Sequence, residues 1–256
     1  MQIPQSQGQV IPNKFVVYTA CDTDYFDQFA KIFCISVLTS AESPVHLHIY
    51  NPRGDQLDWC RANNVGVTWE YVEPTLFEKA TANLLAQGGE GLRRSQVAMT
   101  KGNDTDVNHR IIKTYYACAR FIRLAAVHQQ CSTVFACDVD AVVRKPIPTL
   151  SDKDFYIHQI FGPKARFLAG GLYLNHGASN FINLYSDVLE EKIKSDALYW
   201  SVDQDVLDPL VPQFNYGQLP NSLIDWNMRP DSVVWTAKGA RKNNGSFVTE
   251  QQKYAV

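Results

Sequence analysis

The chain has 256 residues, of which 45% are hydrophobic and 20% charged, values ordinary for a soluble globular protein with a substantial core. Its net charge of -2 and the scatter of its basic residues exclude an extended phosphate-tracking surface, so we expect no nucleic-acid partner. No apolar run approaches the roughly 18 residues that a membrane span needs, and we expect no stable membrane association.

The N-terminal residues and the cysteines indicate where the protein works. Residues 1–13 are polar, contain two prolines and show no signal-peptide pattern, so we expect a flexible lead before a single domain of residues 14–256. The six cysteines fall inside apolar segments and form no C-x-x-C pair. Reduced thiols packed as small hydrophobic side chains fit this distribution, which predicts a cytoplasmic protein.

Strands and helices alternate in the first half of the chain. The patterns predict strands over 14–20, 45–50 and 66–72, helices over 25–40, 55–64 and 109–129, and a further strand that ends at Asp138. Residues 87–108 are rich in Gly, Ser, Thr, Asn and Asp, which predicts a mobile loop of a length typical of lids. The alternation predicts an α/β fold with a mostly parallel, Rossmann-like central sheet flanked by helices.

The second half continues without an internal repeat or a clear linker, which favours one domain. Strands are predicted over 155–160, 168–175 and 232–236, and helices over 179–194 and 205–210.

An apolar run, Val134–Val143, contains two carboxylates one residue apart. In extended backbone Asp138 and Asp140 project to one side and Val139 to the other. Two hard oxygen ligands at this spacing could reach one divalent cation. Taken alone, the triplet fits an ordinary strand-to-loop turn equally well.

Four motifs in a fixed order surround this triplet: Tyr18–Tyr25 after the first strand, Phe135–Ile147 with the D-x-D, Phe167–Asn175 with two adjacent glycines, and Asp203–Leu207, which reads D-Q-D-V-L. Together they resemble the retaining GT-A glycosyltransferases of family 8, which include glycogenin and bacterial lipopolysaccharide galactosyltransferases. A weaker fifth match is Gly239–Lys242. The resemblance implies a GT-A-like fold and Mn²⁺- or Mg²⁺-dependent transfer of a hexose from a UDP-sugar to an unknown acceptor.

The resemblance assigns the nucleoside to the first motif. Thr19, Ala20 and Asp22 would line the base and ribose, and Tyr25 would stack on the uracil. A tyrosine at the start of an apolar helix also fits a plain core position, so the stacking role stays open.

The remaining motifs would surround the diphosphate and the sugar. The resemblance implies a catalytic pair near the anomeric carbon, metal ligands, cations and glycines that approach the donor, and further binding residues: Asp203, Gln204, Asp138, Asp140, Arg120, Arg123, Gly170, Gly171, Gly239 and Lys242. Glycines inside a strand weaken it unless something approaches the backbone closely. The three cations fit solvated surface positions as well.

Two positions depart from the family pattern. Thr236 stands where the family has its third metal ligand, a histidine, and a hydroxyl is a poorer ligand for Mn²⁺. Leu168 replaces an asparagine that contacts the donor, which leaves the sugar undefined. His158 and His176 are the nearest histidines to the motifs, although a lone histidine beside a strand is more often structural.

Other functions remain open. The hydrophobic-D-x-D-x-V-V pattern also marks haloacid-dehalogenase-like phosphohydrolases, in which Asp138 would be the nucleophile, but that family begins with this strand. The missing histidine favours a catalytically silent module that only binds a nucleotide sugar. Sugar-nucleotide pyrophosphorylases share the broad fold, but no glycine-rich phosphate loop follows the first strand here.

Overall fold

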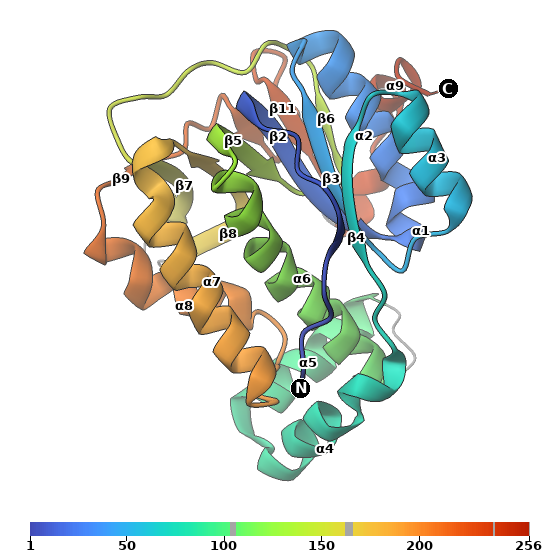
Figure 1. Ribbon diagram of the computed structural model, residues 1–256, viewed down its shortest axis with the longest axis vertical. Coiled ribbons are helices and arrows are strands. Elements are labelled where there is room, and N and C mark those ends of the chain that lie inside the picture. Colours follow the sequence, from blue (N-terminus) through green and yellow to red (C-terminus); the bar gives the residue numbers. More distant parts are fainter. Residues whose placement is uncertain (103–105, 162–165, 238, 256) are drawn as a thin grey trace.

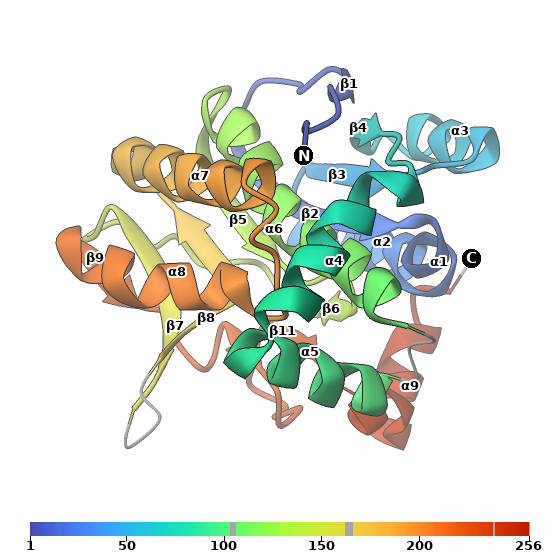
Figure 2. The ribbon, with the colours of Figure 1, turned by 90° about the horizontal axis from the view of Figure 1, so that it is seen from below.

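The computed structural model describes residues 1–102, 106–161, 166–237 and 239–255. Within them a mixed eight-stranded sheet lies between two layers of helices (Figures 1 and 2). A second sheet has three short strands. In chain order the strands are β1 (Gln7–Gly8), β2 (Asn13–Asp22), β3 (Val45–Tyr50), β4 (Gly66–Glu70), β5 (Cys131–Cys137), β6 (Ala141–Val143), β7 (Phe155–Ile160), β8 (Arg166–Leu174), β9 (Tyr216–Gln218), β10 (Ile224–Asp225) and β11 (Val234–Thr236).

The helices fill the connections between these strands. They are α1 (Thr23–Tyr25), α2 (Lys31–Ser36), α3 (Gly54–Ala62), α4 (Glu78–Gln87), α5 (Gly89–Gly102), α6 (Val107–His128), α7 (Ser179–Lys194), α8 (Val202–Leu210) and α9 (Gly245–Gln252). Two π-helical stretches, Phe26–Ala30 and Val37–Ala41, join α1 and α2 into one helical segment, and 3₁₀ turns span Pro74–Phe77, His176–Ala178, Val211–Gln213 and Gly239–Asn243.

The centre of the large sheet is parallel, as the sequence predicts. The order is β1-β4-β3-β2-β5-β8-β7-β9, and the pairs β4-β3, β3-β2 and β2-β5 are parallel. Strands β8 and β1 join this group in the antiparallel sense. The small sheet is ordered β10-β11-β6 and starts directly after the D-x-D turn. The carboxyl ends of β2 and β5 therefore meet at one edge, where a parallel sheet places its ligands.

Strand β5 shows how the sheet buries both faces. Val134 and Ala136 join the apolar core beneath α6, α7 and α8, whereas Phe135 and Cys137 join the core on the opposite face beneath α2 and α3. Side chains alternate along a strand, so burial on both faces requires an unbroken apolar run, which is the pattern seen in the sequence.

Helix α6 crosses one face of the sheet diagonally and ends near β5 (Figure 1). Its first turn is capped by Asp106, whose carboxylate accepts a hydrogen bond from the His109 amide at 2.7 Å. Its apolar face, which includes Ile111 and Tyr115, is fully buried. The opposite stripe carries Arg120 to the carboxyl edge of the sheet.

The loop prediction for residues 87–108 is wrong. Two glycines with positive φ, Gly88 at 60° and Gly89 at 69°, separate α4 from α5, and α5 continues to Gly102; residues 103–105 lie outside the described part. The glycine and polar residues of this segment are typical of a loop, but contacts with other parts of the chain hold it as the helix α5. One of them is a hydrogen bond from the Trp200 amide to Ser95 Oγ at 3.1 Å.

The N-terminal residues, expected to be a flexible lead, are packed against the domain. Gln7 and Gly8 pair with β4, and the terminal ammonium of Met1 lies 3.0 Å from Asp196 Oδ1. The six cysteines are buried and unpaired. Among the described residues, no helix combines the length and apolarity needed to cross a membrane.

Candidate active site

The turn between β5 and β6 presents two carboxylates to a cavity. Asp138 and Asp140 line it, while the Val139 side chain is buried in the core below the turn. Strand β5 ends at Cys137, and its partner β2 ends at Asp22, so residues from both strand ends meet here. The triplet follows the end of β5 as a bend rather than as extended strand, and both acids line the cavity.

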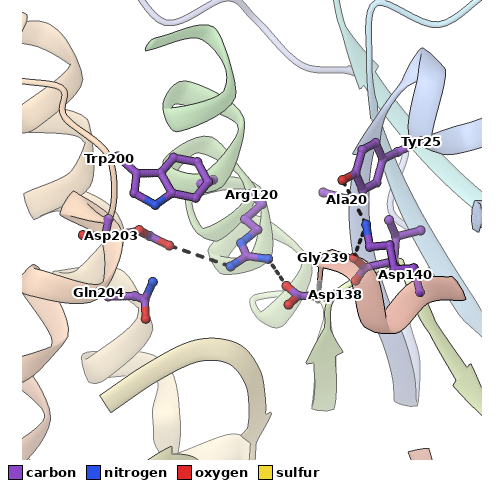
Figure 3. A pocket seen from close by; sticks show the side chains of 13 residues that line it. Ala20, Tyr25, Arg120, Asp138, Asp140, Trp200, Asp203, Gln204 and Gly239 are labelled. Atoms are coloured by element: carbon purple, nitrogen blue, oxygen red, sulfur yellow. Dashed lines mark hydrogen bonds and ion pairs between the residues drawn. The ribbon is translucent and has the colours of Figure 1, made fainter. Parts of the chain in front are cut away.

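Arg120 connects the two acidic motifs (Figure 3). Its Nη1 donates to Asp138 Oδ1 at 2.5 Å, its Nη2 donates to the Ala169 carbonyl at 3.1 Å, and the same Nη2 lies 3.8 Å from Asp203 Oδ2. Burial alone would lower the pKa of Arg120, but the carboxylates of Asp138 and Asp203 outweigh it and raise the pKa. The guanidinium is thus a fixed positive charge in the middle of the site.

Lys242 supplies a second fixed cation at the other acid. Its Nζ lies 2.8 Å from Asp140 Oδ2 and donates to the Tyr25 hydroxyl at 3.1 Å. The ammonium also lies 4.6 Å from the ring centroids of Tyr25 and Phe29. Burial would lower the pKa of Lys242, and Asp140 reverses this and raises it. The 3₁₀ turn Gly239–Asn243 is thereby attached to the D-x-D turn.

The cavity measures about 350 Å³ and brings together most of the residues expected from the motifs. Four of the five motifs, which lie between residues 18 and 242 of the chain, contribute residues to its wall (Figure 3). The expected residues that line it are Ala20, Tyr25, Arg120, Asp138, Asp140, Asp203, Gln204, Gly239 and Lys242.

A second cavity of about 180 Å³ adjoins the first. The two share part of their wall, including Arg120 and Tyr25, and the second adds Asp22 and the stacked rings of Tyr50 and Tyr116, whose centroids are 4.4 Å apart. Asp22 Oδ1 accepts from the Tyr25 amide at 2.8 Å, and burial raises the pKa of Asp22. An aromatic, less charged chamber therefore adjoins a strongly charged one.

Several expected residues lie elsewhere. Thr19 is buried, and its hydroxyl donates to the Cys137 carbonyl at 2.8 Å, so it fastens β2 to β5. Gly170 lies in the buried part of β8. A Cβ at Gly171 would lie 2.2 Å from Ile224 Cδ1, so close packing of a core side chain explains this glycine. Packing against Ile224 accounts for the glycine without a donor sugar.

Arg123 also lies away from both cavities. Its Nε donates to Glu70 Oε2 at 2.8 Å, and its Nη2 donates to the Pro4 carbonyl at 2.7 Å. Glu70 is fully buried and accepts a further hydrogen bond from the Tyr115 hydroxyl at 2.6 Å. Arg123 therefore balances a buried carboxylate of the sheet.

Some residues of the wall were not anticipated. Trp200 and Ser201, shortly before the D-Q-D motif, line the main cavity, and Ala117 and Lys113 lie one and two turns before Arg120 on α6. The spacing of the α6 residues places them on one helix face, a signal that the sequence contains. Trp200 has no comparable signal, because its position depends on α5.

The described residues hold no cluster of three or more histidine, cysteine, aspartate or glutamate side chains poised for a metal ion. His176 is exposed, and His158 packs on the Trp226 ring at 4.8 Å; the residues that line the main cavity include neither. Thr236 pairs with Ala141 across the small sheet, next to Asp140, and its buried hydroxyl has no hydrogen-bond partner among the described residues.

No family model and no curated protein matches the sequence. The structure resembles the galactosyltransferase LgtC, solved in complex with donor and acceptor sugar analogues, at 16% identity and a TM-score of 0.54 over 94% of this chain and 96% of that one. The fold is that of the GT-A glycosyltransferases.

Two further solved structures share this GT-A fold. An active-site mutant of LgtC with a glutamine changed to glutamate matches at 15% identity and a TM-score of 0.53, over 93% of each chain. The glycosyltransferase GlyE of Streptococcus pneumoniae matches at 13% identity and a TM-score of 0.52, over 95% of this chain and 60% of GlyE. Asp138 follows the fifth strand of the chain, whereas the nucleophile of the phosphohydrolase alternative would follow the first.

Proposed function

We propose that this protein is a glycosyltransferase that moves a hexose from a UDP-sugar to an acceptor with retention of the anomeric configuration, assisted by Mn²⁺ or Mg²⁺. The observation that carries the proposal is the convergence, in one cavity, of the D-x-D pair, the first two residues of the D-Q-D motif and two fixed cations. Retention follows from the motifs' resemblance to a retaining family.

The two cavities suit the two halves of a nucleotide sugar. The smaller chamber offers the rings of Tyr25, Tyr50 and Tyr116 to a base and the Asp22 carboxylate to a ribose hydroxyl. The larger one offers cations to a diphosphate and the polar side chains of the D-Q-D motif to a hexose. In this proposal the bond to be broken would lie between the D-x-D turn and α8.

The residues at the D-x-D turn fit a hard divalent cation in part. Asp138 and Asp140 would hold the ion, and phosphate oxygens, water or the unpartnered hydroxyl of Thr236 would complete its shell. When bound, such an ion supplies Lewis-acid stabilisation of the leaving diphosphate. A chain that lacks the family histidine would hold the ion by fewer protein ligands.

The cations of the chain perform complementary work. Lys242 and Arg120 each neutralise one acid of the D-x-D turn, and both lie on the wall of the cavity that would take the diphosphate. Positive groups fixed before the reaction stabilise developing negative charge without reorganisation. On the other side, Asp203 and Gln204 would contact the hexose, and Trp200 would limit access of water.

Binding of UDP tests this proposal without knowledge of the acceptor. UDP with Mn²⁺ should raise the unfolding temperature more than UDP or Mn²⁺ alone, because a ligand of the native state stabilises it. Asp140→Asn should reduce the joint effect, whereas Asp187→Asn, an exposed change on α7, should not. No UDP effect, together with phosphate-ester turnover that Asp138→Asn abolishes, would favour a phosphohydrolase. UDP binding without transfer from any UDP-sugar would favour a silent binding module.

A further inference from the structure

The three residues of the D-Q-D motif face two different environments. Asp203 and Gln204 line the main cavity, whereas Asp205 lines a groove between α7 and α8. Successive helix residues are rotated by about 100°, so the first and third residues of the motif project in nearly opposite directions. Asp205 therefore faces away from the place where a donor sugar would bind.

Asp205 is a meeting point for three side chains from separate parts of the molecule. Its Oδ2 accepts from Arg94 Nη1 at 2.6 Å and from the Tyr199 hydroxyl at 3.0 Å, and its Oδ1 accepts from Arg166 Nη2 at 3.3 Å. Arg94 belongs to α5 and Arg166 begins β8. The carboxylate thus fastens the first turn of α8 to a helix and to the sheet at once.

Helix α5 makes two more contacts with the segment that leads into α8. Ser95, which is fully buried, accepts from the Trp200 amide, and Gly91 lies so close to Tyr199 that an added Cβ would come within 3.2 Å of its side chain. Trp200 also lies over the Arg110 guanidinium at 4.3 Å from the ring centroid. These contacts set the position of the cavity wall.

The junction between this segment and α8 is strained. Ser201, the N-cap of α8, has a φ of 73°, in the left-handed region that disfavours residues with a Cβ. Such backbone persists where surrounding contacts over-determine it. Here the Trp200 amide is held on one side and Asp205 on the other, and the Val202 amide donates back to the Tyr199 carbonyl at 3.1 Å.

We propose that Asp205 is a positioning residue and that α5 acts through it as a brace: the Arg94–Asp205 ion pair holds the start of α8 so that Asp203 and Gln204 keep their places in the cavity. The kinetic consequence rests on the proposed transferase function, while the structural consequence does not. Both partners are partly exposed, with side chains 35% and 29% accessible, so the pair contributes little to overall stability and acts on local geometry.

Two arginines of α5 provide a matched test. Arg93 and Arg94 both pair with Glu90, but the described contacts join only Arg94 to the α8 segment. Hydrogen exchange followed by mass spectrometry should show faster exchange over residues 199–207 in Arg94→Met and in Asp205→Asn, and unchanged exchange in Arg93→Met. Arg94→Lys should recover part of the protection. Equal exchange in the two methionine variants would overturn the brace.

Kinetics provide a second readout. A displacement of about 1 Å at reacting groups can cost on the order of 10²-fold in rate, so Arg94→Met should lower kcat about tenfold or more with KM for the UDP-sugar within about twofold. A raised KM at unchanged kcat would contradict a positioning role. If the parent protein transfers no sugar, the proposed function fails, and the exchange experiment still decides whether α5 braces the segment.

Discussion

Removal of the Lys242 ammonium should strengthen metal binding in the absence of nucleotide. Lys242 Nζ lies 2.8 Å from one oxygen of Asp140, so this cation competes with a metal ion for the Asp140 carboxylate. A nucleoside diphosphate would offer the lysine another anionic partner. Lys242→Met should therefore raise the affinity for Mn²⁺ alone and lower the affinity for UDP.

The size of the effect follows from the burial of the pair. At 2.8 Å and an effective dielectric constant of about 20, the attraction is about 6 kcal/mol before desolvation. Loss of one partner costs about 3–5 kcal/mol in buried pairs and about 0–1 kcal/mol in exposed ones. The two side chains are 20% and 14% accessible, so we expect about 2 kcal/mol, which corresponds to a roughly 30-fold increase in Mn²⁺ affinity.

Electron paramagnetic resonance of free Mn²⁺ measures this affinity directly. Lys253→Met is the matched control, because Lys253 also forms an ion pair of 2.8 Å, with Glu250, but its side chain is 57% accessible and it does not line the cavity. Nucleotide-free Mn²⁺ affinity that is unchanged or weaker in Lys242→Met would refute the argument, whatever the variant does to catalysis.

Three further outcomes concern stability. Burial lowers the pKa of His46 to about 4 from its ordinary 6.5, so on acidification the unfolded chain takes up the proton before the folded protein does. The neutral His46 therefore contributes at most about 3 kcal/mol to the free energy of unfolding. This contribution is complete above pH 6.5 and is lost as the pH falls through 4. Urea titrations at a series of pH values should show this loss, and His46→Gln should make the free energy of unfolding depend less on pH. The same pH dependence in the parent and the variant would contradict the prediction. Gly171→Ala should lower the free energy of unfolding by about 1–3 kcal/mol, and Ile224→Val, which deletes the obstructing carbon, should restore it unless the glycine serves a ligand. Arg123→Met should cost about 3–5 kcal/mol by removing the guanidinium that balances the buried Glu70 carboxylate, yet leave the UDP affinity of the folded protein unchanged; a weaker affinity would place Arg123 at the donor after all.

The sequence predicts those features that depend on local patterns. The apolar run before Asp138 predicts a strand buried on both faces, and the alternation of elements predicts the parallel centre of the sheet. The D-x-D and D-Q-D motifs can be recognised in the sequence because each places polar side chains at a short, fixed spacing. The structure brings them together in the way that their order in the chain suggests.

Features that depend on distant neighbours were not accessible. Arg120 and Arg123 lie three residues apart on one helix, and only the position of Glu70 on a separate strand decides that the second serves the core. The conformation of α5 depends on Ser95 and Arg94 contacts with the α8 segment, so its composition alone indicates a loop. The same contacts place Trp200 at the cavity.

The proposed transfer is tested most directly by incubation of the protein with a panel of UDP-sugars, a set of candidate glycan acceptors and Mn²⁺, with UDP release measured and the product analysed by NMR. We expect UDP release that requires the metal, falls at least 100-fold in Asp138→Asn, on the scale of about 10²–10³ for loss of one electrostatic contact, and gives a product with the anomeric configuration of the donor. Release at the parent rate in Asp138→Asn, or no release from any UDP-sugar while UDP itself binds, would contradict the function proposed for this cavity.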